Sequence, residues 1–213
     1  MIYLESAILL AVQSHEGQFD ADGTPHILHS LEVMFAVKNE LEGRTIEEIQ
    51  SAYAATREEL LIAAVLHDVV EDTPVELDTI RDAYGQCVAG IVDSVTRRAG
   101  ESYRDFIYRA RVSKGGRLVK KCDLLKNIGR LPGIKVAHPQ WHDKLDYKYH
   151  IALRVLDALR DSMTWEQASW KTETEYVDGQ RVQKFYTADP NGKRIEVTQE
   201  QIDAIRLPAA SNP

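Results

Sequence analysis

The sequence has little cysteine. Only Cys87 and Cys122 occur among its 213 residues, and they do not form a C-x-x-C pair. Two cysteines are too few for the disulfide framework of a small secreted domain. Because both lie within apolar helical patterns, we expect two reduced, mostly buried thiols.

Long apolar runs are also absent. No stretch approaches the roughly 18 apolar residues that a membrane-spanning helix requires. The N-terminus, residues 1–5, lacks the basic start and the cleavage site of a signal peptide. We therefore expect no membrane insertion and a cytoplasmic location.

The sequence has no overall excess of positive charge. Its 26 Lys and Arg and 33 Asp and Glu give a net charge of −7, which argues against general nucleic-acid binding. The charge is uneven, because residues 97–130 contain 11 Lys and Arg but only 3 Asp and Glu. A basic segment on an acidic protein is better suited to a small, highly charged anion than to a long polyanion. The competing interpretation is that these side chains only solvate exposed helix faces.

Strand patterns are absent from the first 162 residues. Apolar residues recur there at helical spacing, and loop-forming residues separate the segments. The segment 58–70 is apolar nearly all round, which places it at the centre of the fold. Gly85 and Pro132 are expected to end helices. We predict an all-α bundle of about eight helices, over 3–18, 30–41, 46–55, 58–70, 74–85, 87–98, a segment starting near 103, 117–131 and 140–162.

The composition changes after Thr164. Polar residues then alternate with apolar or aromatic ones, and Asp178-Gly179 is typical of a type I′ hairpin turn. We expect strands over 173–177, 181–186 and 194–197, followed by a short helix capped by Thr198. The chain is therefore divided into a helical domain, 1–163, and a C-terminal appendage, 164–213, which contains a β-meander and a helix docked on that domain.

His67 and Asp68 stand in tandem at the end of the most buried predicted helix. Burying both without partners costs several kcal/mol, so a cationic side chain or a metal has to compensate them. Imidazole nitrogen and carboxylate oxygen are suited to divalent ions such as Mn²⁺, Fe²⁺ or Zn²⁺. Glu71 and Asp72 follow within about a turn. Carboxylates are unfavourable at a helix C-terminus, so a bound cation, a catalytic role or simple solvation has to account for this pair.

Two other segments place polar side chains among apolar ones. His29 precedes the second predicted helix, and Asp123 lies in an apolar run with Asn127 one turn later on the same face. For His29 the alternative to a metal ligand is a structural histidine. For Asp123 the alternative is a salt bridge with Lys120 or Arg130.

The order His, His-Asp, Asp resembles the HD superfamily of metal phosphohydrolases. More narrowly, the chain resembles the hydrolase domain of the RelA/SpoT homologues and the small stand-alone alarmone hydrolases. Residues 11–29 look like that family's first motif, and 66–73 match its second almost letter for letter. Residues 84–96 resemble the stretch that follows, and 121–127 resemble the last motif. The resemblance covers roughly residues 3–160.

The resemblance implies an all-helical fold, one Mn²⁺ ion or another divalent cation, and removal of the 3′-pyrophosphate from guanosine tetra- or pentaphosphate. By motif match, the metal ligands are His29, His67, Asp68 and Asp123. Glu71 and Asp72 would activate or position the attacking water, and Asn127 would hold the substrate, a small anionic nucleotide. Phosphate contacts are expected from Lys121, Lys126, Arg130 and Arg104. His15 would orient a ligand or the loop from outside the metal shell.

The sequence departs from the family pattern where substrate is recognised. Phe19-Asp20 stands in place of a basic pair, His26 in place of a tyrosine, and the arginine after Asn127 falls at 130 rather than 129. Two alternatives therefore stay open. One is an HD-type nucleotide or NADPH phosphatase, and the other is a catalytically silent, metal-bound regulatory module. Self-association into a homo-oligomer is also left open.

Overall fold

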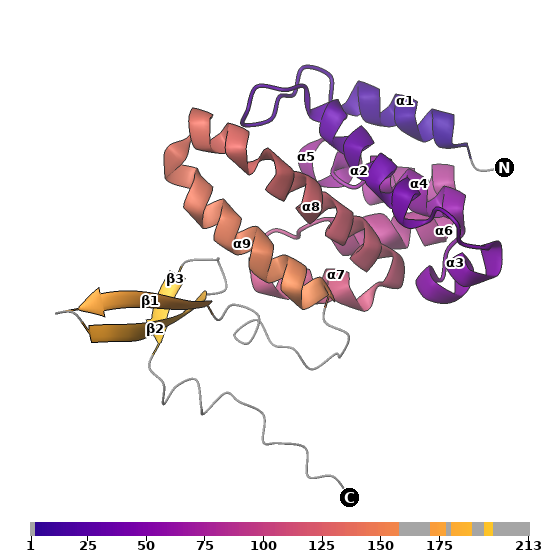
Figure 1. The fold of residues 1–213 in the computed structure, drawn as a ribbon. Helices are drawn as coiled ribbons and strands as arrows, with labels where there is room; N and C mark the ends of the chain where they lie inside the picture. Colours follow the sequence, from indigo (N-terminus) through magenta and orange to yellow (C-terminus); the bar gives the residue numbers. More distant parts are fainter. Residues whose placement is uncertain (1–2, 158–170, 178–179, 189–193, 198–213) are drawn as a thin grey trace, which may run out of the picture.

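The computed structural model describes residues 3–157, 171–177, 180–188 and 194–197 (Figure 1). The helices are α1 (Leu4–Ser14), α2 (His26–Glu40), α3 (Ile46–Tyr53), α4 (Arg57–Val65), α5 (Val69–Asp72), α6 (Leu77–Val95), α7 (Tyr103–Val112), α8 (Lys114–Ala137) and α9 (Pro139–Asp157). The strands are β1 (Lys171–Val177), β2 (Gln180–Ala188) and β3 (Arg194–Val197). This order confirms the predicted helical fold with a small C-terminal meander.

The strands form one antiparallel sheet in the order β1-β2-β3. Val177 pairs with Gln180, and Phe185 pairs with Val197. The three predicted strands lie within the bounds of the observed ones. The turn predicted at 178–179 and the helix predicted after Thr198 lie outside the described residues. The division of the chain at residue 163 stays a prediction.

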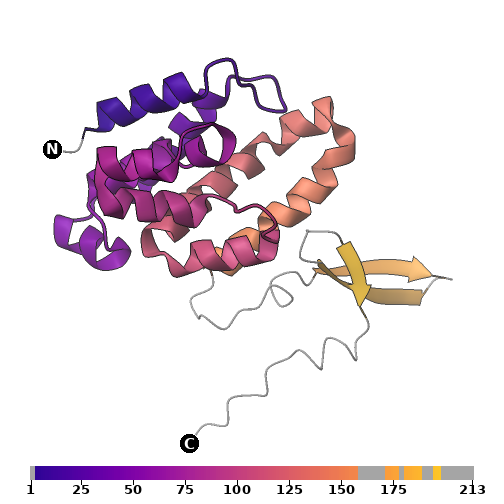
Figure 2. The same ribbon diagram turned by 180° about the vertical axis from the view of Figure 1, so that it is seen from behind.

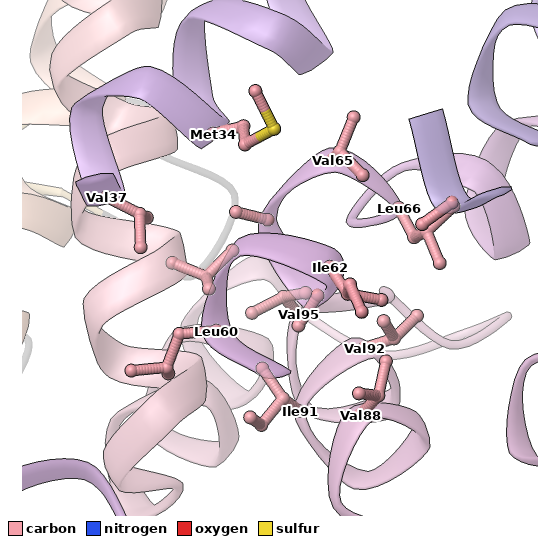
Figure 3. Close-up of a cluster of buried hydrophobic side chains, with 14 of the residues drawn as sticks. Met34, Val37, Leu60, Ile62, Val65, Leu66, Val88, Ile91, Val92 and Val95 are labelled. Atoms are coloured by element: carbon pink, nitrogen blue, oxygen red, sulfur yellow. The ribbon is translucent and has the colours of Figure 1, made fainter. Parts of the chain in front are cut away.

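Helix α4 lies in the main core because its residues 60–65 are all apolar. Leu60 and residues 62–66 are fully buried, and the helix packs against α1, α2, α6 and α8. Figure 3 shows side chains from α2, such as Met34 and Val37, and from α6, such as Val92, gathered around those of α4. The predicted central position of this segment is therefore confirmed.

A second core lies among α7, α8 and α9. Both views show α9 running back along α8 (Figures 1 and 2). The buried residues of this cluster are Tyr103, Phe106, Ile107, Leu124, Tyr147, Ile151, Ala152, Val155 and Leu156. Helix α8 joins the two cores, because Val119 and Cys122 belong to the first and Leu124 to the second. Polar residues of α8 between these apolar ones can therefore be buried where the two cores meet.

Two helix boundaries near the predicted site differ from expectation. Helix α2 begins at His26 rather than near Ser30, directly after Pro25, because a proline at a helix start loses no hydrogen bond. His29 is therefore inside the helix. Helix α4 ends at Val65 rather than at Val70, and a turn over 66–68 leads into α5.

Helix α6 begins at Leu77 rather than directly after Thr73. The Thr73 hydroxyl donates to the Val69 carbonyl at 2.6 Å and accepts from the Val75 amide, so it closes α5 instead of capping α6. Gly85, with φ 86°, interrupts α6, which confirms the break predicted there.

Helix α8 does not have the predicted ends. It begins at Lys114, capped by the Ser113 side chain, and it continues through Pro132 to Ala137. Proline removes one backbone donor inside a helix. Here Leu131 is buried and α8 packs along α9, and this tertiary packing outweighs the local cost.

The prediction of two free, mostly buried thiols agrees with the structure. Cys122 is buried and Cys87 is half-buried, and both are free thiols. Among the described residues, no helix combines the length and the apolar character needed to cross a membrane.

Gly116 marks a close approach between α8 and α6, and we expect its replacement by alanine to destabilise the fold by about 1–3 kcal/mol. A Cβ at this position would overlap the hydroxyl of buried Ser94, which is held by the Ile91 carbonyl. The control is Gly129→Ala, on the same helix with no atom near the new methyl group, which should be neutral or stabilising. Urea unfolding of both variants provides the measurement, and equal stabilities would contradict the close packing.

Candidate metal centre

His67 is positioned by the turn that follows α4. Its side chain is 1% exposed, and its Nδ1 lies 2.9 Å from the Ala64 carbonyl oxygen. A carbonyl only accepts, so the proton is on Nδ1 and the lone pair of Nε2 is free. Within the described part of the chain, Nε2 is buried without a hydrogen-bond partner, although Asp68 Oδ2 lies 2.9 Å away. Two lone pairs that meet at this distance require a proton or a cation between them.

His29 and Asp123 complete this arrangement from two other helices. His29 Nε2, on α2, lies 3.1 Å from Asp123 Oδ1, on α8, and both side chains are buried. His29 Nε2 is also 3.8 Å from Asp68 Oδ2, and His67 Nε2 is 3.9 Å from Asp123 Oδ1. The structure therefore brings together all four side chains predicted as metal ligands.

The chemistry of this group suits a divalent metal ion. His29, His67 and Asp123 offer ligand atoms that lie within 4.8 Å of one another. Two imidazole nitrogens and carboxylate oxygens are the donor set of borderline to hard divalent ions. The buried, unpartnered Nε2 of His67 fits such an ion, because a neutral imidazole nitrogen in the interior otherwise loses its interaction with water.

Asp123 faces the two histidines and also forms the salt bridge with Lys120 that the sequence left open, whereas Arg130 pairs with Asp20. Its Oδ1 faces the histidines, while its Oδ2 lies 2.6 Å from Lys120 Nζ. Asn127 Nδ2 donates to Oδ1 at 2.5 Å. Burial alone would raise the pKa of Asp123, but Lys120 and the histidines outweigh burial and hold the pKa well below its usual range. Asp123 is therefore a carboxylate at any pH near neutrality.

A cavity of about 190 Å³ opens over this group. Its lining combines ligand candidates, cations and aromatic rings: Asp20, His26, His29, Asp68, Glu71, Arg97, Tyr103, Phe106, Lys120, Asp123, Leu124, Asn127, Lys148 and Tyr149. We call it the metal cavity. Two larger cavities adjoin it and share Arg97 with it, and the one of about 550 Å³ also includes Tyr103, Lys148, Trp141 and Lys144.

The two acidic residues of α5 occupy different places. Glu71 lines the metal cavity, and its Oε2 accepts a hydrogen bond of 2.7 Å from the Arg97 amide. Burial raises the pKa of Glu71. Asp72 lies instead beside His26 and Asp68, and its pKa is raised by burial and then by the charge of Asp68. Only Glu71 is placed to face a molecule bound in the cavity.

None of the four side chains predicted to contact phosphate lines the metal cavity. Lys121 pairs with Asp157 on α9 at 2.9 Å, Arg130 pairs with Asp20 at 2.6 Å, and Arg104 lies beside its neighbour Asp105. Lys126 is also absent from the lining. The cations that do line the cavity are Arg97, Lys120 and Lys148.

The sequence signal for Lys120 was available. Lys120 and Asn127 lie three residues before and four residues after Asp123, so all three share one face of α8, whereas Lys121 does not. Lys148 lies on α9, and only tertiary structure brings it to the cavity.

A polar network connects the departures from the family pattern. His26 Nδ1 lies 2.8 Å from Asp20 Oδ1, and His26 Nε2 lies 3.5 Å from Asp68 Oδ2. Arg130 holds Asp20 from the other side at 2.6 Å. The neighbouring carboxylates of Asp20 and then Asp68 raise the pKa of His26 to about 10. His15 is buried, and its ring centroid lies 4.4 Å from that of His26.

Comparisons with known proteins agree with this geometry. Residues 7–104 match the family model of the HD domain. The bifunctional (p)ppGpp synthase/hydrolase SpoT of Escherichia coli is 33% identical over 102 residues, which are 48% of this chain but only 12% of the relative. The guanosine-3′,5′-bis(diphosphate) 3′-pyrophosphohydrolase MESH1 of Danio rerio is 30% identical over 132 residues, 59% of this chain and 67% of the relative.

A solved structure supports the same grouping. It is that of a metazoan orthologue of SpoT that hydrolyses ppGpp and plays a role in starvation responses. It superposes with a TM-score of 0.55 at 25% identity and covers 73% of this chain and 87% of its own. Taken with the His, His-Asp, Asp group at the floor of a cavity, these matches show that the chain belongs to the HD domain family and is a relative of these pyrophosphohydrolases.

Proposed function

We propose that this protein is a metal-dependent phosphohydrolase that removes the 3′-pyrophosphate of guanosine tetra- or pentaphosphate. The observation that carries the proposal is the group of His29, His67, Asp68 and Asp123 at the floor of a cavity lined by Glu71 and by cationic side chains. The names of the relatives supply the substrate class. A cytoplasmic location and self-association stay predictions from the sequence.

The four ligand side chains would hold one divalent cation, and we propose Mn²⁺. When bound, it supplies Lewis-acid chemistry, which lowers the pKa of water and draws charge from a phosphoryl oxygen. Lys120 and Asn127 keep Asp123 ionised and fixed in orientation, as outer partners of ligands commonly do.

Glu71 is the proposed proton acceptor. Its carboxylate faces the cavity, and its raised pKa brings it closer to that of an effective general base. Water would attack the phosphorus of the 3′-pyrophosphate, and Glu71 would take its proton. The bond between that phosphorus and the 3′-oxygen breaks, and the 3′-oxygen receives a proton as the pyrophosphate leaves.

Arg97, Lys120 and Lys148 form the proposed phosphate subsite. Lys148 Nζ lies 4.0 Å from the centroid of the Tyr103 ring and forms no ion pair among the described residues. Burial, and then the positive charge of Lys120 and Arg97, lower the pKa of Lys148 to about 8. A cluster of cations that repel one another is stabilised when an anion enters it.

A pH dependence follows from Lys148. A lysine with a pKa of about 8 loses its charge as the pH rises through that value, so kcat/KM for a phosphorylated substrate should fall above about pH 8. Lys148→Arg should remove this decline, because arginine stays protonated. Lys38→Arg, at an ion pair remote from the cavity, should keep it. Identical profiles for Lys148→Arg and the wild type would exclude Lys148 from the phosphate subsite.

A second candidate function keeps the metal centre and changes the substrate. Where the resembling family shows a basic pair, Phe19 is 67% exposed and Asp20 lines the metal cavity. A carboxylate there repels phosphate, which favours a different nucleotide, such as NADPH or another phosphorylated nucleoside. The catalytically silent module is the remaining alternative.

Product analysis distinguishes these functions. The purified chain with Mn²⁺ is incubated with guanosine tetraphosphate, NADPH and a panel of nucleoside phosphates, and released phosphate and pyrophosphate are measured separately. Pyrophosphate from the tetraphosphate supports the proposal. Phosphate from another nucleotide, with the tetraphosphate unchanged, supports the second candidate. If the metal-loaded protein turns over none of these substrates, the result supports the catalytically silent regulatory module.

A further inference from the structure

A second set of ligand atoms lies next to the first. His26, Asp68 and Asp72 each offer one atom within 4.8 Å of the others. Asp68 belongs to both sets, since its Oδ2 is 3.5 Å from His26 Nε2 and 2.9 Å from His67 Nε2. One carboxylate thus stands between two groups of imidazole and carboxylate donors. His26 and Asp68 both line the metal cavity.

His26 has the support that metal-binding histidines usually have. Its Nδ1 lies 2.8 Å from Asp20 Oδ1, and the second oxygen of Asp20 is held by Arg130 at 2.6 Å. A carboxylate that accepts the Nδ1 proton directs the Nε2 lone pair outward, as in carboxylate–histidine–metal triads. His26 Nε2 is buried and has no hydrogen-bond partner in the described part of the chain.

His15 is an independent indication of a ligand at this place. Its side chain is buried, with only 2% exposed, and its Nδ1 lies 2.8 Å from Gln18 Oε1. Gln18 also donates to the Asp72 carbonyl, which ties His15 to the end of α5. The remaining nitrogen, Nε2, is buried without a partner among the described residues, beside the His26 ring and within electrostatic reach of Asp68 and Asp72.

We propose that the centre binds two divalent cations. The second is held by His26 and Asp72, with Asp68 shared between the two sites and the buried ring of His15 beside them. This inference rests on the first metal group and does not depend on which nucleotide is the substrate. Imidazole and carboxylate donors are again suited to Mn²⁺ or a similar ion.

The second site also accounts for the replacement of the basic pair. Where the resembling family shows a basic pair, this chain has Phe19-Asp20, and Asp20 places a carboxylate on the wall of the metal cavity. The same Asp20 orients His26, so the substitution that removes cationic side chains builds support for a cation. A second divalent ion would restore positive charge at the wall of the cavity formed by Asp20, His26 and Asp68.

The test is a count of bound metal, independent of activity. The full chain is stripped of metal, dialysed against excess Mn²⁺ and analysed for manganese, and electron paramagnetic resonance is recorded on the same samples. We expect about two Mn²⁺ per chain, with the exchange coupling of two ions that share a carboxylate. His26→Phe should reduce the count to one and remove the coupling.

Two further variants complete the design. His142→Phe removes a histidine paired with Asp143 on α9, away from the cavity, and should keep two ions. Asp20→Asn keeps every proposed ligand but weakens the support of His26, and the second ion should bind ~10–100-fold more weakly while the first is unchanged. The Asp20→Asn variant keeps the test valid if His26→Phe does not fold.

The competing arrangement leaves a proton on His26 Nε2, between Asp20 and Asp68. In that case the wild type binds one uncoupled ion, and Asp20→Asn has no effect on metal affinity. Either result would overturn the two-ion proposal. A protein that binds two ions but hydrolyses none of the nucleotides would contradict the proposed function and leave this inference standing.

Discussion

Asp68→Ala is expected to abolish metal binding and hydrolysis together. Asp68 Oδ2 lies within 4 Å of Nε2 of three histidines, His26, His29 and His67, so its removal leaves the imidazoles without the negative charge at their centre. A cation would then have to bind with one carboxylate fewer, next to Lys120. Metal-assisted chemistry contributes several kcal/mol to such reactions, so turnover should fall by ~10³ or more.

The measurement combines metal analysis with turnover on the same sample. Asp78→Ala serves as the control, because it also removes an aspartate from an ion pair, with Arg81, but on the exposed face of α6. It should keep both metal and activity. Circular dichroism should show unchanged helix content in both variants. An Asp68→Ala protein that is metal-free and fully active would contradict the assignment of this centre to catalysis.

Glu71→Gln is expected to separate metal binding from turnover. Glutamine has the same shape and can still accept the hydrogen bond from the Arg97 amide, so the loop that carries Arg97 stays in place. The side chain loses its ability to take a proton. Turnover should fall by ~10² or more, the scale of general acid–base groups, while metal content and KM stay close to those of the wild type.

Two variants make this result specific. Glu71→Ala also removes the anchor of Arg97, so it should raise KM in addition to lowering kcat. Glu76→Gln, at an exposed position before α6 whose side chain forms no cap, should change neither. Full turnover by Glu71→Gln would show that another group accepts the proton.

The sequence was sufficient to select the four side chains that the fold brings together as the candidate metal centre, although it placed two of them in the wrong local structure. His29 was expected before α2 and lies inside it, and His67 was expected within a helix and lies in a turn. The turn has a physical consequence: it frees the Ala64 carbonyl to accept from His67 Nδ1. Spacing and residue type predict which side chains come together at the candidate metal centre, whereas their orientation depends on hydrogen bonds that no periodicity reveals.

The start of α7 was predicted correctly. It begins at Tyr103, where the Ser102 side chain caps it through a hydrogen bond from the Asp105 amide. Pro132 failed as a stop signal because its local cost is small compared with the burial of Leu131 and the packing of α8 along α9. Local signals set a boundary only when tertiary packing does not oppose them.

The phosphate subsite was the part least accessible from sequence. The basic segment 97–130 is evident in the sequence. Lys121, which was predicted to contact phosphate, instead pairs with Asp157, and Lys120 lines the metal cavity. Lys148 and Tyr149 come from α9, some 25 residues after Asp123 in a different part of the fold. No local pattern connects residues that meet only when α9 folds back along α8.

Removal and restoration of the metal tests the central claim most directly. The wild-type protein is freed of metal with a chelator and assayed for pyrophosphate release from guanosine tetraphosphate, before and after addition of Mn²⁺. The account predicts no release from the metal-free protein and recovery of turnover as Mn²⁺ binds to the centre formed by His29, His67, Asp68 and Asp123. Release at the same rate in the presence of chelator would contradict it.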